Sequence, residues 1–278
     1  MTTAVLNASE VMQATGEKRY AVLEIYSAVQ GEGQRIGVPS TVIRLGGCTV
    51  GCKWCDTKYS WKASVPADKR MTLDEIVAKV DDVTTHKTVF ITGGEPLEHP
   101  TPMIVDLITA LHRRGYHVTV ETSGTGHDTF HINELLRQVP RGKRILWSVS
   151  PKLSSAQPHK PFPELWLWLE NAVSFDHRIQ FKFVVDVGQM DTQLEEIELH
   201  LMRLVLTTYH NGVHVILQPC TPVVQRPEME VQLTVLNNLR KLQEEIVRRQ
   251  FLGWLPENVT LQILPQLHAA IYGQRRLV

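Results

Sequence analysis

Three of the four cysteines of this 278-residue chain lie within eight residues, at Cys48, Cys52 and Cys55, with the spacing CxxxCxxC. Thiols clustered in this way do not resemble a disulfide framework but are typical of metal binding in a reducing compartment. A four-iron cluster and a structural zinc ion each require four ligands, so three local thiolates leave one coordination position without a partner. The spacing therefore predicts an iron-sulfur cluster with one open iron, which could bind a small molecule directly.

A zinc site is the alternative interpretation of these cysteines. Its fourth ligand would come from a distant side chain, for which His86, His99 and Cys220 are candidates. Cys220 fits a small pocket or core residue better than a cluster ligand, because free cysteine behaves as a small apolar side chain. The cysteines alone leave both kinds of site open.

The elements that must position these cysteines follow an alternating pattern. Short runs of β-forming residues alternate with longer segments of helical periodicity, which favours repeated βα units. The predicted strands are residues 21–25, 40–45, 88–92, 117–121, 144–148, 179–185, 213–218 and 260–263. The predicted helices are residues 72–80, 101–114, 132–137, 162–171, 192–207 and 228–249. We therefore expect an α/β fold with a largely parallel sheet, and a partial barrel because the βα units are fewer than eight.

Composition is that of an ordinary globular protein. Hydrophobic residues make up 43% of the chain, and 29 basic residues balance 29 acidic ones. This balance gives no reason to expect a nucleic-acid partner. No apolar run is long enough to span a bilayer and no signal peptide is evident, so we expect no membrane partner and a cytoplasmic location. We expect an N-terminal extension over residues 1–20 and a single domain over residues 21–278.

Glycines and polar residues gather where predicted strands give way to loops. Residues 93–96 read Gly-Gly-Glu-Pro, in which glycines let the backbone approach a ligand and Glu95 could hold an amino group. Similar strand ends are residues 121–124 and 148–152, and residues 30–33 read Gln-Gly-Glu-Gly. Arg44 interrupts an apolar run, so it either binds a carboxylate or forms a structural ion pair. Each loop taken alone is also compatible with an ordinary turn.

Taken together, these motifs resemble the radical S-adenosylmethionine superfamily, and more closely its 7-carboxy-7-deazaguanine synthase family. The cysteine spacing, the aromatic residue before Cys55 and the Gly-Gly-Glu-Pro loop are the superfamily features. The features that narrow the resemblance are Arg44 and residues 30–33, 55–57, 121–124, 150–152 and 264–268. The resemblance runs from about residue 24 to the C-terminus and implies a partial barrel of the radical S-adenosylmethionine type.

The resemblance implies that Cys48, Cys52 and Cys55 ligate a [4Fe-4S] cluster whose open iron is chelated by S-adenosyl-L-methionine. Reductive cleavage of that cofactor would give a 5′-deoxyadenosyl radical. Trp54 would pack near the adenine, and Glu95 would help to hold the methionine amino end. The expected cofactor-binding residues are Trp54, Cys55, Asp56, Gly94, Glu95, Ser123, Ser150, Pro151, Lys152, Gln218, Pro219, Cys220 and Thr221.

The substrate that the resemblance implies is 6-carboxy-5,6,7,8-tetrahydropterin. Its ring would contract with loss of ammonia, after removal of the C6 hydrogen, to 7-carboxy-7-deazaguanine in queuosine and related deazapurine biosynthesis. The expected substrate-binding residues are Val29, Gln30, Gly31, Arg44, Thr92 and His268. Thr57 looks like the position that binds Mg²⁺, a hard cation that takes oxygen ligands. The family also implies a reductant such as a flavodoxin-type electron donor, and a homodimer.

Two other functional classes share part of this pattern. Another radical S-adenosylmethionine enzyme, such as a glycyl-radical activase, would share the cysteines and residues 93–96 but would not explain Gln30, Arg44 and Thr57 together. A non-enzymatic metal-binding module would need neither that loop nor the polar strand ends.

Overall fold

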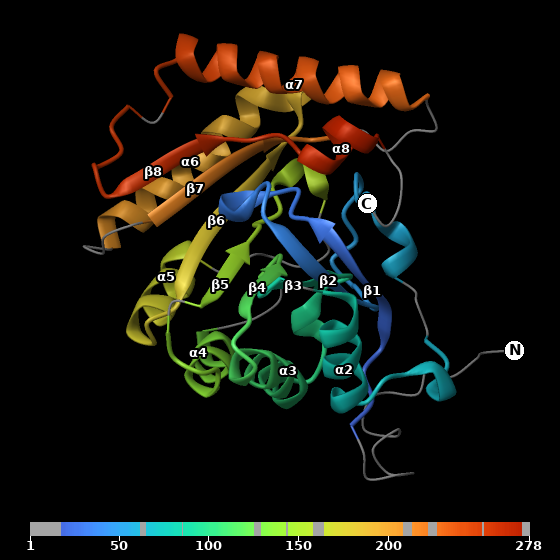
Figure 1. The fold of residues 1–278 in the computed structure, drawn as a ribbon. Coiled ribbons are helices and arrows are strands. Elements are labelled where there is room, and N and C mark those ends of the chain that lie inside the picture. The colour runs from blue at the N-terminus through green and yellow to red at the C-terminus, as the bar shows by residue number, and fades with distance from the viewer. Residues whose placement is uncertain are drawn as a thin grey trace, which may run out of the picture.

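The protein folds around one eight-stranded sheet with helices on its outside (Figure 1). The computed structural model describes residues 18–61, 65–84, 86–124, 129–142, 144–157, 164–207, 213–221, 227–251 and 253–273. The strands are β1 Val22–Val29, β2 Pro39–Leu45, β3 Thr88–Gly93, β4 His117–Thr122, β5 Ile145–Val149, β6 Arg178–Val185, β7 Val213–Pro219 and β8 Val259–Ile263. Each predicted strand is confirmed, with small differences at its ends.

The sheet runs in the order β1 to β8, so strands that follow one another in sequence are neighbours. β1 pairs antiparallel with β2, and every later pair is parallel. Parallel neighbours require crossovers, which the helices supply. Since β1 and β8 form the two edges of this order, the sheet does not close, and the predicted α/β partial barrel is confirmed.

The helices are α2 Leu73–Val83, α3 Thr101–Arg113, α4 Thr129–Gln138, α5 Leu165–Ser174, α6 Met190–Thr207, α7 Glu228–Arg248 and α8 Leu267–Tyr272. Short 3₁₀ helices are η1 Gly33–Arg35, η2 Lys58–Ser60, η3 Ala67–Lys69, η4 Pro96–Glu98, η5 Ser154–Ala156 and η6 Val187–Gln189. The helix predicted at residues 162–171 begins at Leu165 and runs to Ser174, while residues 162 and 163 lie outside the described chain. The sequence missed α8 because six residues are too short to show helical periodicity.

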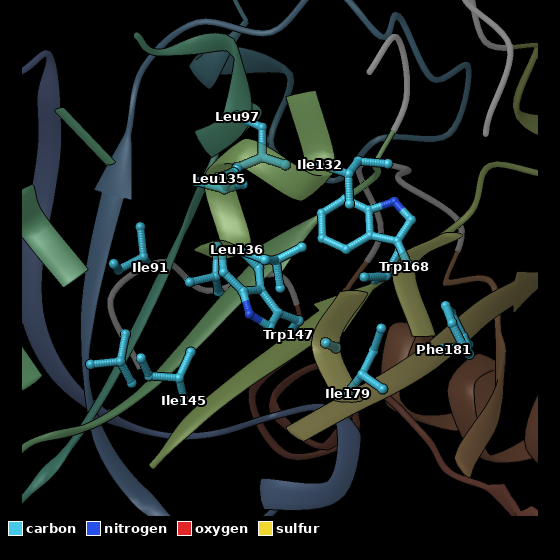
Figure 2. Packing of buried hydrophobic residues seen from close by; sticks show 14 of the residues in the cluster. Ile91, Leu97, Ile132, Leu135, Leu136, Ile145, Trp147, Trp168, Ile179 and Phe181 are labelled. Carbon is cyan, nitrogen blue, oxygen red and sulfur yellow. The ribbon is translucent and has the colours of Figure 1, made fainter. Parts of the chain in front are cut away.

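The main core lies between the sheet and the helices that cover it (Figure 2). Trp147 of β5 and Trp168 of α5 are both fully buried, with ring centroids 5.8 Å apart. The indole of Trp147 hydrogen-bonds to His177 at 3.2 Å, which satisfies its buried donor. This packing fixes the strands whose C-terminal ends bear the polar motifs.

Residues 18–20 already belong to the packed domain. Tyr20 is fully buried, pairs with Met71 in a β-bridge and donates its hydroxyl to the carbonyl of Met103 at 2.9 Å. Residues 1–17, most of the predicted extension, lie outside the described chain. No helix in the described ranges has the length and apolar character needed to cross a membrane.

Candidate functional site

A cavity of about 440 Å³ opens where the strands meet the loops that carry the motifs. Ligand sites of α/β folds lie at such strand ends. Every predicted site residue lines this cavity except Pro151 and Pro219. Side chains alternate along an extended chain, so Ser150 and Lys152 face the cavity while Pro151 between them does not; Pro219 likewise follows the cavity-facing Gln218.

Glycines join the predicted cofactor loops to one another. A Cβ at Gly94 would lie 2.0 Å from the carbonyl oxygen of Gly47, and one at Gly93 would lie 2.1 Å from that of Leu45. Gly93 also has a φ of +133°, which disfavours any other residue. The sequence predicted that these glycines admit a ligand, but in this structure they admit the backbone that leads into Cys48.

The same loop holds the cysteine segment through Glu98 and His99. The Glu98 carboxylate accepts the Thr49 amide at 2.9 Å from both oxygens and also accepts the Thr49 hydroxyl. His99 Nε2 hydrogen-bonds to the Gly46 carbonyl at 3.0 Å, so this candidate zinc ligand has a structural partner. The cysteine segment is therefore anchored mainly by groups outside its thiols.

The thiols themselves lie on the cavity wall. Burial raises the pKa of Cys48 to about 11 and raises that of Cys52. Cys55 Sγ accepts the Trp61 indole N–H at 3.2 Å and lies 3.6 Å from the Thr57 hydroxyl. Within the described ranges, no three histidine, cysteine or acidic side chains form a group able to hold one metal ion. A cubane cluster binds each thiolate to a different iron, so the three ligands need not converge on one point.

Glu95 is organised by the strand end beside it. It is 2% exposed and accepts the Thr122 hydroxyl at 2.5 Å, the Ser123 amide at 2.7 Å and the Ser123 hydroxyl at 2.6 Å. These donors keep the carboxylate in one orientation at the cavity wall. Glu95 can therefore present a fixed negative charge to an amino group.

Several polar atoms at the cofactor end have no partner. Trp54 Nε1, Gln218 Oε1 and Thr221 Oγ1 are buried and make no hydrogen bond within the described chain, and all three residues line the cavity. Buried polar groups are normally paired, so these atoms fit a polar ligand. Lys152 lies 5.8 Å from the centroid of the Trp54 ring and donates to Ser150 at 3.0 Å. Unpaired polar atoms, an aromatic face and three thiols together fit an iron-sulfur cluster with a nucleoside cofactor.

Arg44 is part of a charged group on the cavity wall and lies 6.0 Å from the centroid of the Tyr59 ring. Its Nε donates to Glu24 at 2.9 Å, with both side chains largely buried. Burial alone would lower the pKa of Arg44, but the hydrogen bond with Tyr26 and the charge of Glu24 raise it overall. The ion-pair interpretation of Arg44 thus describes this structure, while the guanidinium still faces the cavity.

Glu121 lies beside Gln30 and Thr92 on the inner wall. Its carboxylate accepts Gln30 Nε2 at 2.9 Å. Burial raises the pKa of Glu121, although hydrogen bonds from Gln30 and Thr92 and the charge of Arg44 oppose this. A buried carboxylate in a ligand cavity can recognise a polar group of the ligand or accept a proton from it.

Glu32, Lys182 and Gln266 form a group that the sequence did not predict. Lys182 of β6 forms an ion pair with Glu32, and their side chains are 9% and 12% exposed. Gln266 Nε2 donates to Glu32 at 2.7 Å and lies 3.3 Å from Asp56 Oδ2. Burial lowers the pKa of Lys182 to about 8. One feature of the sequence could have indicated Lys182. Gln180 and Lys182 are two residues apart in the apolar strand β6, and residues at alternate positions of a strand face the same side, here the interior.

His268 of α8 completes the cavity next to Gly31. A Cβ at Gly31 would lie 2.1 Å from His268 Nδ1, so a larger residue at this position would displace the His268 ring. Burial lowers the pKa of His268, and the opposing charges of Asp56 and Glu121 only partly offset this. Other lining residues that the sequence did not single out are Glu24, Tyr26, Tyr59 and Trp61.

Comparison with known proteins shows the family to which the chain is related. Residues 42–150 match the model of the radical S-adenosylmethionine superfamily. A 7-carboxy-7-deazaguanine synthase of Pyrobaculum aerophilum is 33% identical over 258 residues, which cover 93% of this chain and 97% of that relative. The synthase of Escherichia coli K12 is 36% identical over 126 residues, which cover 38% of this chain and 54% of that relative.

The fold is similar to a solved structure of the same kind. The crystal structure of QueE from Escherichia coli superposes with a TM-score of 0.58 at 26% identity, covering 92% of this chain and 99% of that one. This structural likeness and the sequence alignment with the Pyrobaculum aerophilum relative each cover more than nine tenths of the chain. The chain therefore belongs to the 7-carboxy-7-deazaguanine synthase family of radical S-adenosylmethionine enzymes.

Proposed function

We propose that the cavity contracts the ring of 6-carboxy-5,6,7,8-tetrahydropterin, with loss of ammonia, to 7-carboxy-7-deazaguanine for queuosine and related deazapurine biosynthesis. The observation that carries this proposal is that one cavity is lined by the three thiols, by the cofactor loops and by the predicted substrate residues of β1, β2 and α8. A module that only binds metal would not need the buried charged groups on the cavity wall. A glycyl-radical activase acts on a protein, for which a largely buried polar wall is a poor fit.

At the cofactor end, we assign Cys48, Cys52 and Cys55 to a [4Fe-4S] cluster and the unpartnered polar atoms to S-adenosyl-L-methionine. When bound, these groups supply one-electron reduction and a carbon radical able to remove hydrogen from the substrate. The protein contributes orientation. Glu95 offers its fixed carboxylate to the methionine amino group, and Trp54 offers its ring and N–H to the nucleoside.

At the substrate end, the residues offer polar groups suited to a flat heterocycle with a carboxylate. Arg44 is the cation of this wall and Glu121 is its buried acceptor, with Gln30 and Thr92 between them. His268 closes the cavity over Gly31. Substrate binding here would exclude water from the reacting carbon, which a radical step requires.

We assign Mg²⁺ to Thr57, next to Asp56, because both line the cavity between the thiols and the substrate wall and offer oxygen ligands. We also propose a reductant such as a flavodoxin-type donor, which the family resemblance implies, and the cytoplasmic location expected from the sequence, which shows no apolar span or signal peptide. A homodimer would suit the apolar stripe on α7, where Met229, Leu233 and Leu236 are more than half exposed. The oligomeric state can be checked by light scattering on the purified protein.

Anaerobic reconstitution tests the function. We expect a brown protein with four irons per chain that, once reduced, makes 7-carboxy-7-deazaguanine from the carboxypterin with S-adenosyl-L-methionine and Mg²⁺. Formation of 5′-deoxyadenosine without this product would favour another radical enzyme. Uptake of zinc without a cluster would refute the proposal.

A pair of variants tests the two metal assignments separately. Cys52→Ala removes a buried thiol of the cluster segment, so cofactor cleavage should be abolished. Thr57→Ala should keep the cluster and its absorption but lower turnover and its dependence on Mg²⁺. Equal loss of iron in both variants would refute this division of roles.

A further inference from the structure

Two chain segments enter the open side of the sheet and meet there. Residues 30–35 follow β1, and residues 264–268 follow β8, so they come from the two edge strands that do not pair with each other. They touch through the Leu267 amide, which donates to the Gly31 carbonyl at 2.9 Å, and through His268 against Gly31. Figure 1 shows α8 beside the loop that leads from β1 to β2.

The inner face of β6 supports the first of these segments at two points. Gln180 Oε1 accepts the Gln34 amide at 2.8 Å, and Lys182 forms its ion pair with Glu32. Gln180 is in turn fixed by Ser148 Oγ at 2.6 Å. β6 lies in the middle of the second half of the sheet, so it provides a rigid base for the incoming loop.

Glu32 connects β6 to the second segment. One of its carboxylate oxygens pairs with Lys182, and the other accepts Gln266 Nε2 at 2.7 Å. Breaking a buried ion pair is costly because the remaining charge lacks a partner. The Glu32 network, defined as Glu32, Lys182 and Gln266, therefore joins three segments that no shared strand pairing joins.

We infer that Lys182 and Gln266 are positioning residues for the substrate. Through Glu32 they set where Gln30, Gly31 and His268 stand on the cavity wall. This inference rests on the proposed function for the identity of the substrate, and it gives a role to a largely buried lysine on a strand that is otherwise mostly apolar. In a complete barrel, pairing between the edge strands β1 and β8 would hold these segments together, and here the Glu32 network connects the loops that follow those strands.

Hydrogen exchange on the protein without cluster or substrate tests the coupling directly. Lys182→Met should speed exchange of the Gln34 amide, which lies in the loop it holds. It should also speed exchange of the Leu267 amide by about tenfold, although Lys182 does not contact that residue. Lys79→Met is the matched control, because Lys79 forms an exposed pair with Asp82 on α2. Unchanged exchange at Leu267 would overturn the inference.

Steady-state kinetics of the reconstituted enzyme provide a second test of the inference. Lys182→Met and Gln266→Leu should each raise KM for the carboxypterin about tenfold. Substrate-free cleavage of S-adenosyl-L-methionine should stay within about twofold of wild type in Lys182→Met, because Gln266, and not Lys182, donates to the predicted cofactor-binding residue Asp56. Because both act through Glu32, the double variant should fall short of the product of the two effects. Fully multiplied effects, or a loss of cofactor cleavage in Lys182→Met as large as its effect on KM, would overturn the inference.

Lys182→Arg distinguishes loss of the ion pair from general unfolding. It keeps the positive charge, so its KM should stay close to that of wild type, while the KM of Lys182→Met should rise. If Arg and Met variants behave alike, the ion pair is not the cause. A wild-type enzyme that makes no 7-carboxy-7-deazaguanine would instead refute the proposed function, while leaving the exchange result at Leu267 to be judged separately.

Discussion

The two ends of the cavity are held together by different kinds of contact. At the cofactor end, the main chain of residues 93–94 lies against the main chain of residues 45–47, with an amide of Gly94 bonded to the Leu45 carbonyl at 2.9 Å. At the substrate end, buried ion pairs line the wall: the pair of Lys182 with Glu32 joins segments that are distant in sequence, and the pair of Arg44 with Glu24 lies across the neighbouring strands β1 and β2. The first end depends on a close backbone approach that a side chain at residue 93 or 94 would block, with Glu98 and His99 also holding the cysteine segment, and the second end depends on buried ion pairs.

This difference has consequences for stability. Backbone contacts through glycine impose a steric limit but bury no charge. Buried ion pairs carry a desolvation cost and contribute little net stability, though losing one partner is expensive. We therefore expect the cofactor end to fail when atoms are added. We expect the substrate end to lose stability when one partner of an ion pair is removed, but to gain stability, at the expense of function, when a buried carboxylate outside those pairs, such as Glu121, is neutralised.

Gly94→Ala should give the largest effect at the cofactor end. The new Cβ would lie 2.0 Å from the Gly47 carbonyl oxygen, which is backbone and cannot turn aside. We expect a loss of about 3 kcal/mol in the free energy of unfolding, measured by denaturant titration, because overpacking of this kind forces backbone movement. The reconstituted variant should also hold less iron, since the segment that shifts leads into Cys48.

Gly188→Ala is the matched control for that substitution. Its Cβ would have Asp186 Oδ1 as nearest neighbour at 3.3 Å, and that atom belongs to a side chain that can move. The change in unfolding free energy should stay within about 0.5 kcal/mol. Similar losses in both variants would mean that close backbone approach is not what distinguishes the cofactor end.

Glu121→Gln should act in the opposite direction at the substrate end. The amide keeps an oxygen for Gln30 Nε2 and removes a buried charge, so we expect a gain of roughly 1 kcal/mol in unfolding free energy near neutral pH. Turnover of the carboxypterin should fall. Stability gained with activity lost is typical of a strained functional group.

The stability difference between Glu121→Gln and wild type should depend on pH. Because burial raises the pKa of Glu121 in the folded protein, its protonated form favours folding. That contribution is present below the unfolded pKa and is lost as the pH rises through the folded pKa. The thermal midpoint of Glu121→Gln should therefore exceed that of wild type by little at pH 5 and by more at pH 8. Glu257→Gln, at an exposed position, should show no such trend; a constant difference for Glu121→Gln would contradict the assignment.

The contrast between the two ends also explains what the sequence could predict. Cysteine spacing and paired glycines are local, so the cofactor loops were visible without a structure. The eight strands were predicted from local patterns of apolar residues for the same reason. Lys182 and Glu32 are 150 residues apart in the chain, and although Glu32 lies in the motif of residues 30–33, nothing in that motif predicts a contact with Lys182. The short helix α8 was missed because it has too few residues to show helical periodicity, and tertiary contacts such as that of Leu267 with Gly31 stabilise it instead.

Trp61 gives the smallest predicted effect and the finest test of the comparison. Its indole N–H is a side-chain donor at the cofactor end, and it points at Cys55 Sγ rather than at another part of the fold. Hydrogen bonds to cysteine sulfur stabilise the more negative, reduced form of an iron-sulfur cluster, and so help to set its potential. A side chain here is expected to tune the cluster without holding the loop.

Trp61→Phe keeps the ring and removes the donor. If the cofactor end is held by backbone, the variant should bind as much iron as wild type and unfold at nearly the same denaturant concentration. Its cluster potential should fall by roughly 20 to 60 mV, the one-electron equivalent of one ordinary hydrogen bond, as measured by titration with spectroscopic detection. Trp254→Phe, in an exposed position, should leave the potential unchanged. Loss of iron in Trp61→Phe with no change in potential would mean that Trp61 holds the cysteine segment in place and does not tune the cluster, which would contradict the role assigned to it.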